Sequence, residues 1–365
     1  MNFDFSEEEK LVQDQIHRYL SDQCGLDVHR SVLDGKTSHA ESVWQGLSDM
    51  GVQGTAIPAT YGGVEAGYLT LCLAAEELGS HLAPVPFSSS IYLCAEAILQ
   101  YGSNEQKERW LPKLASGEII GTLAVTESVE EVRQDNIKTT FDAGRLNGQK
   151  LVVPHGQVAD IAIVLARQDD RLVLVLTELD GVNRESIETV DPTMASATLD
   201  FVNQPAQVLD TADGWAAYQD VNNRAAVLYA FEQIGGAAKA LDMSVTYARE
   251  RFAFGRPIGS FQALKHMMAD MYVALKLAES NCYYAAWALE NNADDLPLAA
   301  ATARVSATQA YQLCARDNIQ VHGGMGFTWE FDCHLYYRRS NYLTVVLGGL
   351  ATWENKLISA LPDAA

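Results

Sequence analysis

One interruption between two long helical patterns constrains this chain more than any other feature. Apolar residues recur every three or four positions over 241–248 and again over 261–271, as expected for helices with a buried face. The residues 255–257, Gly-Arg-Pro, separate the two patterns, because Pro257 lacks a backbone donor and disfavours helix at the preceding residue. Ser260 stands where an N-cap would start the second helix. The sequence therefore predicts two long helices that meet at a rigid turn.

Cationic side chains gather at this turn. Arg249, Arg251 and Arg256 lie close together in the sequence, and Gln262 follows shortly after them. Guanidinium groups held at a fixed turn suit the bidentate binding of a phosphate or a carboxylate. An ordinary helical hairpin with a solvated basic turn would carry the same residues, so composition alone leaves both interpretations open.

Two segments of the chain resemble signatures of the acyl-CoA dehydrogenase family. Residues 251–270 read RFAFGRPIGSFQALKHMMAD, and residues 320–330 read QVHGGMGFTWE, in the order that the family shows. In that family, both segments reach across a subunit interface and hold the pyrophosphate and adenosine half of a neighbouring subunit's FAD. The resemblance thus implies FAD as cofactor and an acyl-CoA as substrate. It also implies these cofactor-binding residues: Arg251, Phe254, Gln262, Gln320, Gly323 and Gly324.

The helical and strand patterns, together with the resemblance, predict a mainly α protein with a central β domain. We expect an N-terminal α-helical domain over 1–118, a small barrel-like β domain over 119–212 and a C-terminal four-helix bundle over 213–365. The helices of the last region carry apolar residues on more than one face. This indicates that they also pack against other subunits of a tetramer.

Short local signals mark where several elements begin. The segments 6–9 (Ser-x-x-Glu) and 103–106 (Ser-x-x-Gln) are capping boxes, and the first would start a helix that directs Leu11 inward. The Asn-Gly pair at 147–148 is typical of a two-residue turn between antiparallel strands.

Charge and cysteine usage exclude several classes of protein. The chain has 47 acidic and 26 basic residues and a formal net charge of −21, which argues against nucleic acid binding. Its six cysteines form no Cys-x-x-Cys pair, which is typical of buried thiols in a reducing compartment and predicts neither disulfides nor a metal site. The acidic N-terminus and the lack of a long apolar run predict a cytoplasmic protein without membrane insertion.

Both positions where the family carries its catalytic carboxylate hold apolar residues here. In the family, that carboxylate removes a proton from the carbon next to the thioester carbonyl, and the flavin takes a hydride from the following carbon. The commoner position matches Leu347, and the rarer one, on the helix before the turn, matches Ala225. Glu232 lies two helical turns after Ala225 and is the alternative base, although a mid-helix glutamate is more often structural. We therefore predict no catalytic residue in this chain.

The residues that would face the flavin ring differ from the family as well. Members usually read Thr-Glu-Pro-x-x-Gly-Ser-Asp where this chain reads TESVEEV, at 126–132. After the Asn-Gly-x-Lys segment, the family's aromatic residue and its flavin-contacting threonine correspond to Val152 and Pro154. Proline has no N–H to donate, and valine has no ring to cover the flavin. The residues that would contact this chain's own flavin ring are therefore mostly replaced. The residues that would bind the FAD of a neighbouring subunit are retained.

This asymmetry resembles the heteromeric α2β2 branch of the family, in which one subunit type carries the base and the other completes the cofactor site. Such enzymes typically oxidise bulky acyl-CoAs, including steroid side chains. The sequence therefore predicts the non-catalytic chain of such a complex, paired with a second acyl-CoA dehydrogenase-like subunit. Two alternatives stay open: a self-sufficient homotetramer with Glu232 as a displaced base, and a non-enzymatic CoA-thioester or scaffold protein.

Overall fold

The computed structural model describes residues 5–361. These residues form two compact units, each assembled from segments that are distant in the sequence. One unit consists of the described parts of Met1–His29, Cys72–Ala83 and Ala226–Ala365, and the other of Arg30–Leu71 and Pro84–Ala225. The expected three-domain boundaries at 118 and 212 stay a prediction.

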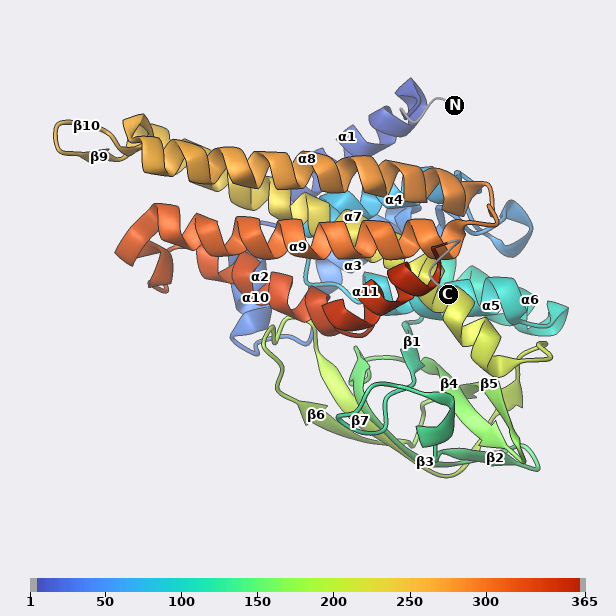
Figure 1. Ribbon diagram of the computed structural model, residues 1–365. Coiled ribbons are helices and arrows are strands. Elements are labelled where there is room, and N and C mark those ends of the chain that lie inside the picture. The colour runs from blue at the N-terminus through green and yellow to red at the C-terminus, as the bar shows by residue number, and fades with distance from the viewer. Residues whose placement is uncertain (1–4, 362–365) are drawn as a thin grey trace. The chain divides into compact units, whose positions relative to one another are not determined.

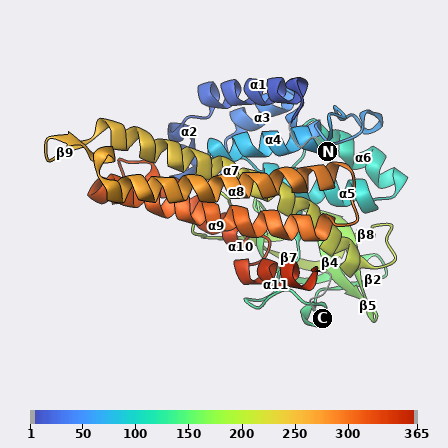
Figure 2. The same cartoon turned by 45° about the horizontal axis from the view of Figure 1, so that its top comes forward.

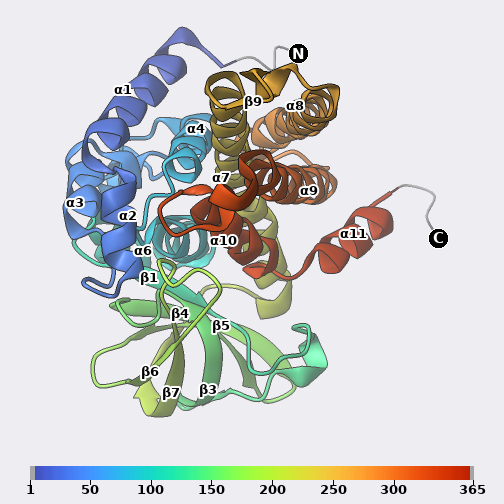
Figure 3. The same cartoon turned by 90° about the vertical axis from the view of Figure 1, so that its left-hand side faces the viewer.

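Long helices that run side by side build the first unit (Figures 1 and 2). Its helices are α1 (Glu7–Gln23), the second part of α4 (Gly67–Ser80), the larger part of α7 (Gly214–Glu250), α8 (Gln262–Glu290), α9 (Leu296–His322), α10 (Cys333–Val345) and α11 (Leu350–Ser359). The short antiparallel strands β9 (Phe252–Ala253) and β10 (Arg256–Pro257), followed by the 3-10 turn Ile258–Ser260, connect α7 to α8. A second 3-10 segment, Gly323–Phe327, follows α9. Figure 3 views α7, α8 and α9 nearly end-on as a bundle.

Glycines allow α7 to cross α4 at very short distance. A Cβ atom on Gly235 would lie 1.9 Å from the carbonyl oxygen of Glu76, and one on Gly79 would lie 1.9 Å from that of Glu232. Both distances are well below van der Waals contact, so any side chain at either position would push the helices apart. The crossing places the backbone of Glu232 inside the unit.

The second unit combines short helices with one sheet. Its helical segments are the end of α2 (Leu26–Leu33), α3 (Glu41–Asp49), the 3-10 turns Val52–Gly54, Ala59–Tyr61 and Gln134–Asn136, the start of α4, the π-helix Ser88–Ala95, α5 (Glu96–Tyr101), α6 (Asn104–Ala115) and the start of α7. Among the described residues, no helix of either unit combines the length and hydropathy needed to cross a membrane.

The sheet of the second unit has the strand order β6-β7-β3-β2-β4-β5-β8, with β1 paired in parallel to β4. Figure 3 labels β1 and β3 to β7 of this sheet. The strands are β1 (Gly121–Ala124), β2 (Thr140–Asp142), β3 (Arg145–Pro154), β4 (Ile161–Gln168), β5 (Arg171–Glu178), β6 (Asn183–Ile187), β7 (Ser196–Pro205) and β8 (Gln207–Val208). Most neighbours are antiparallel, and β4 is buried over its whole apolar stretch. This sheet is the central β structure that the sequence predicts.

Helix starts agree with the sequence prediction, whereas one predicted face is wrong. Both capping boxes form, at Ser6 and Ser103, with the serine hydroxyl accepting from the backbone three residues on. Leu11, however, is 59% exposed, although Ile16 and Leu20 on the same helix are buried. The inward stripe of α1 is therefore narrower than the sequence pattern indicates.

The predicted Asn-Gly hairpin at 147–148 is also wrong, because both residues lie inside β3. The turn between β2 and β3 is formed by Ala143 and Gly144, whose φ angles of 47° and 78° are left-handed values of the kind a type I′ turn requires. Gly148 instead lies at an irregularity of the β3–β7 pairing, where a Cβ would be 2.7 Å from the Thr139 hydroxyl oxygen. Glycine is needed there for close packing and not for a turn.

Candidate functional site

The predicted break between the two long helices is a β-hairpin that extends beyond the end of α7 and α8 (Figure 1, left). Its base is closed by backbone hydrogen bonds: Arg251 N–H donates to Tyr247 O at 2.8 Å, and Ile258 N–H donates to Arg251 O at 2.8 Å. At its tip, Phe254 and Gly255 have φ angles of 54° and 77°. These are left-handed backbone conformations, which glycine adopts readily but which are unfavourable for a bulky residue such as Phe254. The backbone at the tip is therefore strained.

The hairpin differs from the expected corner in two details. Ser260 does not cap α8, because its hydroxyl donates to Pro257 O at 2.7 Å and Phe261 takes the N-cap position without a side-chain cap. The Arg256 guanidinium carbon lies 4.1 Å from the centre of the Phe261 ring, a cation–π contact within the hairpin. Arg256 is thus turned toward its own chain.

An aromatic contact holds the two signature segments together at this end of the bundle. Tyr247 of α7 stacks on His322 at the end of α9, with ring centres 4.1 Å apart and planes at 24°. Nδ1 of His322 lies 2.8 Å from the carbonyl oxygen of Asn318 and so carries the proton of that hydrogen bond. Burial lowers the pKa of His322, which favours the neutral ring in this stack. Because Arg251 and Gly323 follow the stacked residues closely in sequence, the stack fixes the two segments relative to each other.

All six predicted cofactor-binding residues are exposed: Arg251, Phe254, Gln262, Gln320, Gly323 and Gly324. The Phe254 side chain is 93% exposed, and among residues 5–361 the Arg251 guanidinium has no hydrogen-bonding or ion-pair partner. A Cβ on Gly323 or Gly324 would meet no atom within 4 Å, so the backbone is open to an approaching molecule. An unpaired guanidinium and an open glycine backbone suit a phosphate, while the assignment of these residues to FAD stays a prediction.

Neither position expected for the base offers a proton acceptor. Leu347 is 9% exposed and Ala225 is fully buried. Glu232 is 4% exposed, and its Oε1 lies 3.4 Å from Nη1 of Arg339, which is itself fully buried. This interior ion pair supports the structural interpretation of Glu232, because a catalytic base must be within hydrogen-bond reach of the substrate.

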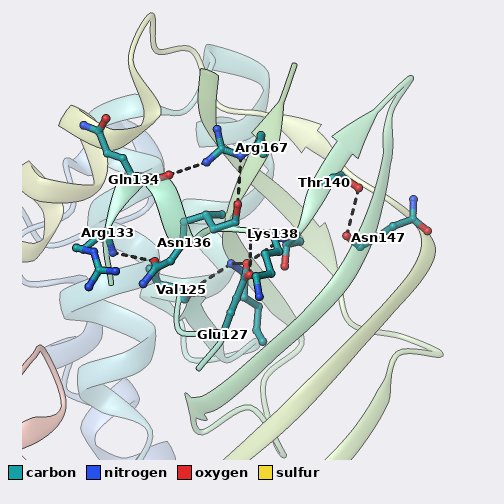
Figure 4. Close-up of polar contacts among 12 residues, drawn as sticks. Val125, Glu127, Arg133, Gln134, Asn136, Lys138, Thr140, Asn147 and Arg167 are labelled. Carbon is teal, nitrogen blue, oxygen red and sulfur yellow. Dashed lines mark hydrogen bonds and ion pairs between the residues drawn. The ribbon is translucent and has the colours of Figure 1, made fainter. Parts of the chain in front are cut away.

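In the β domain, the family-like residues that remain have a structural role (Figure 4). Nζ of the buried Lys150 lies 2.6 Å from Oε1 of Glu127 and donates to the carbonyl oxygen of Val125 at 3.0 Å. Glu127 also accepts from the backbone N–H groups of Lys138 and Thr139, at 2.6 and 3.0 Å. Burial lowers the pKa of Lys150 to about 8. Burial opposes ionisation of Glu127 too, but Lys150 and these hydrogen bonds outweigh it and hold the Glu127 pKa below its usual value.

Two residues, Val152 and Pro154, lie at the positions where the resemblance predicts contacts to the flavin ring. Val152 has a φ angle of 49°, unusual for a β-branched residue, and is 46% exposed beside an irregularity in the β3–β7 pairing. Pro154 uses its carbonyl oxygen to accept from the Thr122 hydroxyl at 2.6 Å. Neither side chain presents a donor or an aromatic ring.

A buried carboxylate cluster in the second unit was missed by sequence reasoning. Glu96, which follows the π-helix, is 5% exposed and accepts from the Tyr68 hydroxyl and from Nε2 of Gln100, each at 2.9 Å. Arg224 lies 3.5 Å from it and also bonds Asp220 at 2.9 Å. Burial raises the pKa of Glu96, against the opposing effect of Arg224. These partners come from three separate segments, so no local spacing reveals the cluster, and its contacts show a packing role.

Family models match most of the chain. The model for the acyl-CoA dehydrogenase N-terminal domain matches residues 6–118, and that for the acyl-CoA dehydrogenase C-terminal domain matches residues 212–352. The acyl-CoA dehydrogenase IpdE2 of Mycobacterium tuberculosis (strain ATCC 25618 / H37Rv) is 30% identical over 336 residues, which cover 92% of this chain and 91% of the relative.

Solved structures agree with these matches. One described as a steroid ACAD, Tcur3481-Tcur3483, is 30% identical with a TM-score of 0.89 and covers 97% of each chain. The ChsE4-ChsE5 complex from Mycobacterium tuberculosis is 26% identical with a TM-score of 0.89 and covers 100% of this chain and 99% of its own. The predicted fold, helical regions around a central β domain, is confirmed.

Proposed function

The chain belongs to the acyl-CoA dehydrogenase family, whose members are FAD-binding oxidoreductases that act on acyl-CoA, and we propose that it is the non-catalytic, FAD-site-completing subunit of a heteromeric member. One contrast carries the proposal. The residues expected to serve a partner's cofactor are present and exposed, whereas both positions expected to hold the base are occupied by buried apolar side chains.

The described residues fit one half of FAD. The Arg251 guanidinium would pair with the pyrophosphate, and the exposed backbone at Gly323 and Gly324 would let the adenosine half approach closely. On the flavin side, Val152 and Pro154 supply neither the aromatic cover nor the donor that the family uses. When bound, FAD supplies the hydride-accepting ring. This chain would therefore hold the remote half of a cofactor whose ring lies in a partner's site.

We also propose that the partner subunit carries out the proton transfer. Loss of a positioned base typically slows such a step by about 10² to 10⁴. Leu347 and Ala225 have no lone pair to accept the α-proton, and Glu232 is engaged by Arg339 inside the first unit. In the proposed complex, a carboxylate of the second acyl-CoA dehydrogenase-like subunit removes the proton. The related pair described as a steroid ACAD supports a bulky acyl-CoA, such as a steroid side chain, as substrate.

Uncovered apolar side chains on α8 support an assembly with other subunits. Tyr272, Val273 and Leu277 are 54, 55 and 63% exposed. Large apolar residues clustered on one helix mark a protein–protein interface. We propose that this face packs in an α2β2 tetramer, and a monodisperse monomer in light scattering with the partner present would contradict it.

The deciding experiment is expression of this chain alone and together with a second acyl-CoA dehydrogenase-like chain from the same genome. We expect flavin absorbance and acyl-CoA-dependent reduction of an artificial electron acceptor only when both chains are present. The second chain alone is the control, because it must lack full activity if this chain completes its cofactor site. Turnover by this chain alone would instead establish the homotetramer, and a colourless, inactive pair would favour a scaffold protein.

A further inference from the structure

Three side chains with metal-ligating atoms converge in the first unit, away from the residues used above. His17 lies on α1, Glu77 lies in the last turn of α4, and His81 directly follows the end of that helix. One ring nitrogen of each histidine and one carboxylate oxygen of Glu77 lie within 4.8 Å of one another. Nδ1 of His17 is 2.8 Å from Oε2 of Glu77, and Nδ1 of His81 is 3.7 Å from the same oxygen.

Neighbouring groups orient these three side chains. Gln13 donates from Nε2 to the other carboxylate oxygen of Glu77 at 3.0 Å, which leaves Oε2 turned toward the imidazoles. Nδ1 of His81 lies 2.9 Å from the Glu77 carbonyl oxygen, which can only accept, so Nδ1 carries the proton and Nε2 keeps a lone pair. That nitrogen lies 3.1 Å from the Ser21 hydroxyl oxygen. Outer partners of this kind, an amide and a backbone carbonyl, typically position metal ligands in proteins.

The cluster borders a cavity of about 470 Å³, which both histidines line together with Cys24, Asp242 and Tyr336. The His17 side chain is 55% exposed, so the cavity edge is open to an ion from solvent. The ammonium group of Lys239, which also lines the cavity, lies 3.1 Å from Oδ2 of Asp242 and is compensated by it. The site therefore combines an approach route with space for water at an open coordination position.

We propose that His17, Glu77 and His81 bind a divalent first-row transition-metal ion, with Zn²⁺ as the best match. Two imidazole nitrogens and one carboxylate oxygen form a known zinc donor set, and the fourth position would face the cavity. Mg²⁺ and Ca²⁺ fit less well, because they prefer sites built from oxygen ligands. Tetrahedral Zn²⁺ with bonds of about 2.0 Å separates its ligand atoms by about 3.3 Å. Ligand atoms of the three residues lie within 4.8 Å of one another, and the His81 ring must turn to present Nε2 to the ion.

The bound ion would cross-link α1 and the C-terminal end of α4. The ligands come from sequence positions about sixty residues apart, and the hydrogen bond between His17 and Glu77 already bridges the two helices. An ion that binds only the folded chain stabilises it by mass action. This site departs from the sequence-based expectation of no metal, since that expectation rested on cysteine spacing, and the three ligands show no local motif.

The test is calorimetric titration of the chelator-treated full-length chain with Zn²⁺. We expect one site, a rise in the melting temperature with added Zn²⁺, and affinity reduced by roughly 100-fold or more in His81→Ala and in His17→Ala, since loss of an outer partner alone costs about 10- to 100-fold. His266→Ala is the matched control, because His266 is an exposed histidine of α8 outside the cluster. It should bind Zn²⁺ like the wild type.

Two variants keep the outcome clear if one of them folds poorly. His17 is the more exposed ligand, so His17→Ala should keep the native circular dichroism spectrum. Absence of saturable Zn²⁺ binding, or equal affinity in the wild type and both variants, would overturn the proposal. A thiolate-to-metal charge-transfer band with Co²⁺ would also overturn it, because the ion would then be held by cysteine. None of these readouts depends on FAD or on a partner subunit.

Discussion

The two regions of the chain that keep family-like residues keep them for different physical reasons. At the hairpin and the end of α9, the retained side chains are exposed, and Arg251 has no ion-pair or hydrogen-bond partner among residues 5–361. In the β domain, Glu127 and Lys150 are retained and form an interior ion pair at 2.6 Å. A retained residue that makes no contact within the chain is best accounted for by a ligand or a partner subunit. A retained residue that is buried and ion-paired is accounted for by its contribution to folding stability.

This contrast predicts that stability and cofactor binding can be separated by mutation. The Lys150 side chain is buried, so its charge carries a desolvation penalty that the ion pair with Glu127 offsets. The stability of the fold therefore depends on this ion pair. Arg251 lies in solvent, so the fold should tolerate its loss.

Replacement of Lys150 by Met should destabilise the FAD-free chain by about 3–5 kcal/mol, because it leaves the Glu127 charge in the interior without its partner. Urea unfolding followed by circular dichroism measures the free energy of unfolding. Arg251→Ala is the comparison variant and should change that free energy by no more than about 0.5 kcal/mol. Equal losses of unfolding free energy in Lys150→Met and Arg251→Ala would contradict the view that only the β-domain pair stabilises the fold.

Arg251→Ala should instead weaken FAD binding in the assembled complex by about 10- to 100-fold, as expected when charge-assisted hydrogen bonds of about 1.5–3 kcal/mol are lost. Flavin content after gel filtration and titration of FAD into the stripped complex measure the change. The matched control is Arg256→Ala, which should have the smaller effect because Arg256 packs on Phe261. Wild-type flavin content in Arg251→Ala would contradict the assignment of the hairpin to FAD.

The pH dependence of stability provides a third test. The folded-state pKa of Glu127 lies below its ordinary value of 4.5, so its ionised form stabilises the folded chain above that pH. This contribution should be lost as pH falls from 4.5 through the folded-state pKa. In Glu127→Gln it is absent at every pH, so the difference in unfolding free energy from the wild type should shrink on acidification. A constant difference over the acid range would show that the carboxylate charge has no part in the pair.

The sequence predicted the helical regions and the sheet because each carries its own local pattern, whereas the two signature segments were recognised by their resemblance to the family. The capping boxes at Ser6 and Ser103 form as expected, since a cap depends on residues three positions apart. The Asn-Gly turn failed because tertiary pairing placed those residues inside β3. The cluster around Glu96 could not be predicted, because its partners Tyr68 and Arg224 come from other segments and only the fold brings them together.

Replacement of Glu232, the alternative base, should change the turnover rate least. Like Glu127 and Lys150, Glu232 is an interior residue with an ion-pair partner, so we expect it to stabilise the fold and not to take part in catalysis. Its carboxylate is 4% exposed and lies 3.4 Å from the buried Arg339, and its backbone lies against Gly79. Glu232→Gln keeps an oxygen that can accept from Arg339 but removes the charge, so we expect a stability loss of about 1–3 kcal/mol. The rate per bound FAD in the active complex should stay within about a few-fold, whereas loss of a true base costs about 10² to 10⁴. Steady-state turnover normalised to flavin content, with circular dichroism as the folding control, separates the two. A hundredfold loss of rate with FAD bound and the fold intact would make Glu232 the base and this chain a catalytic subunit.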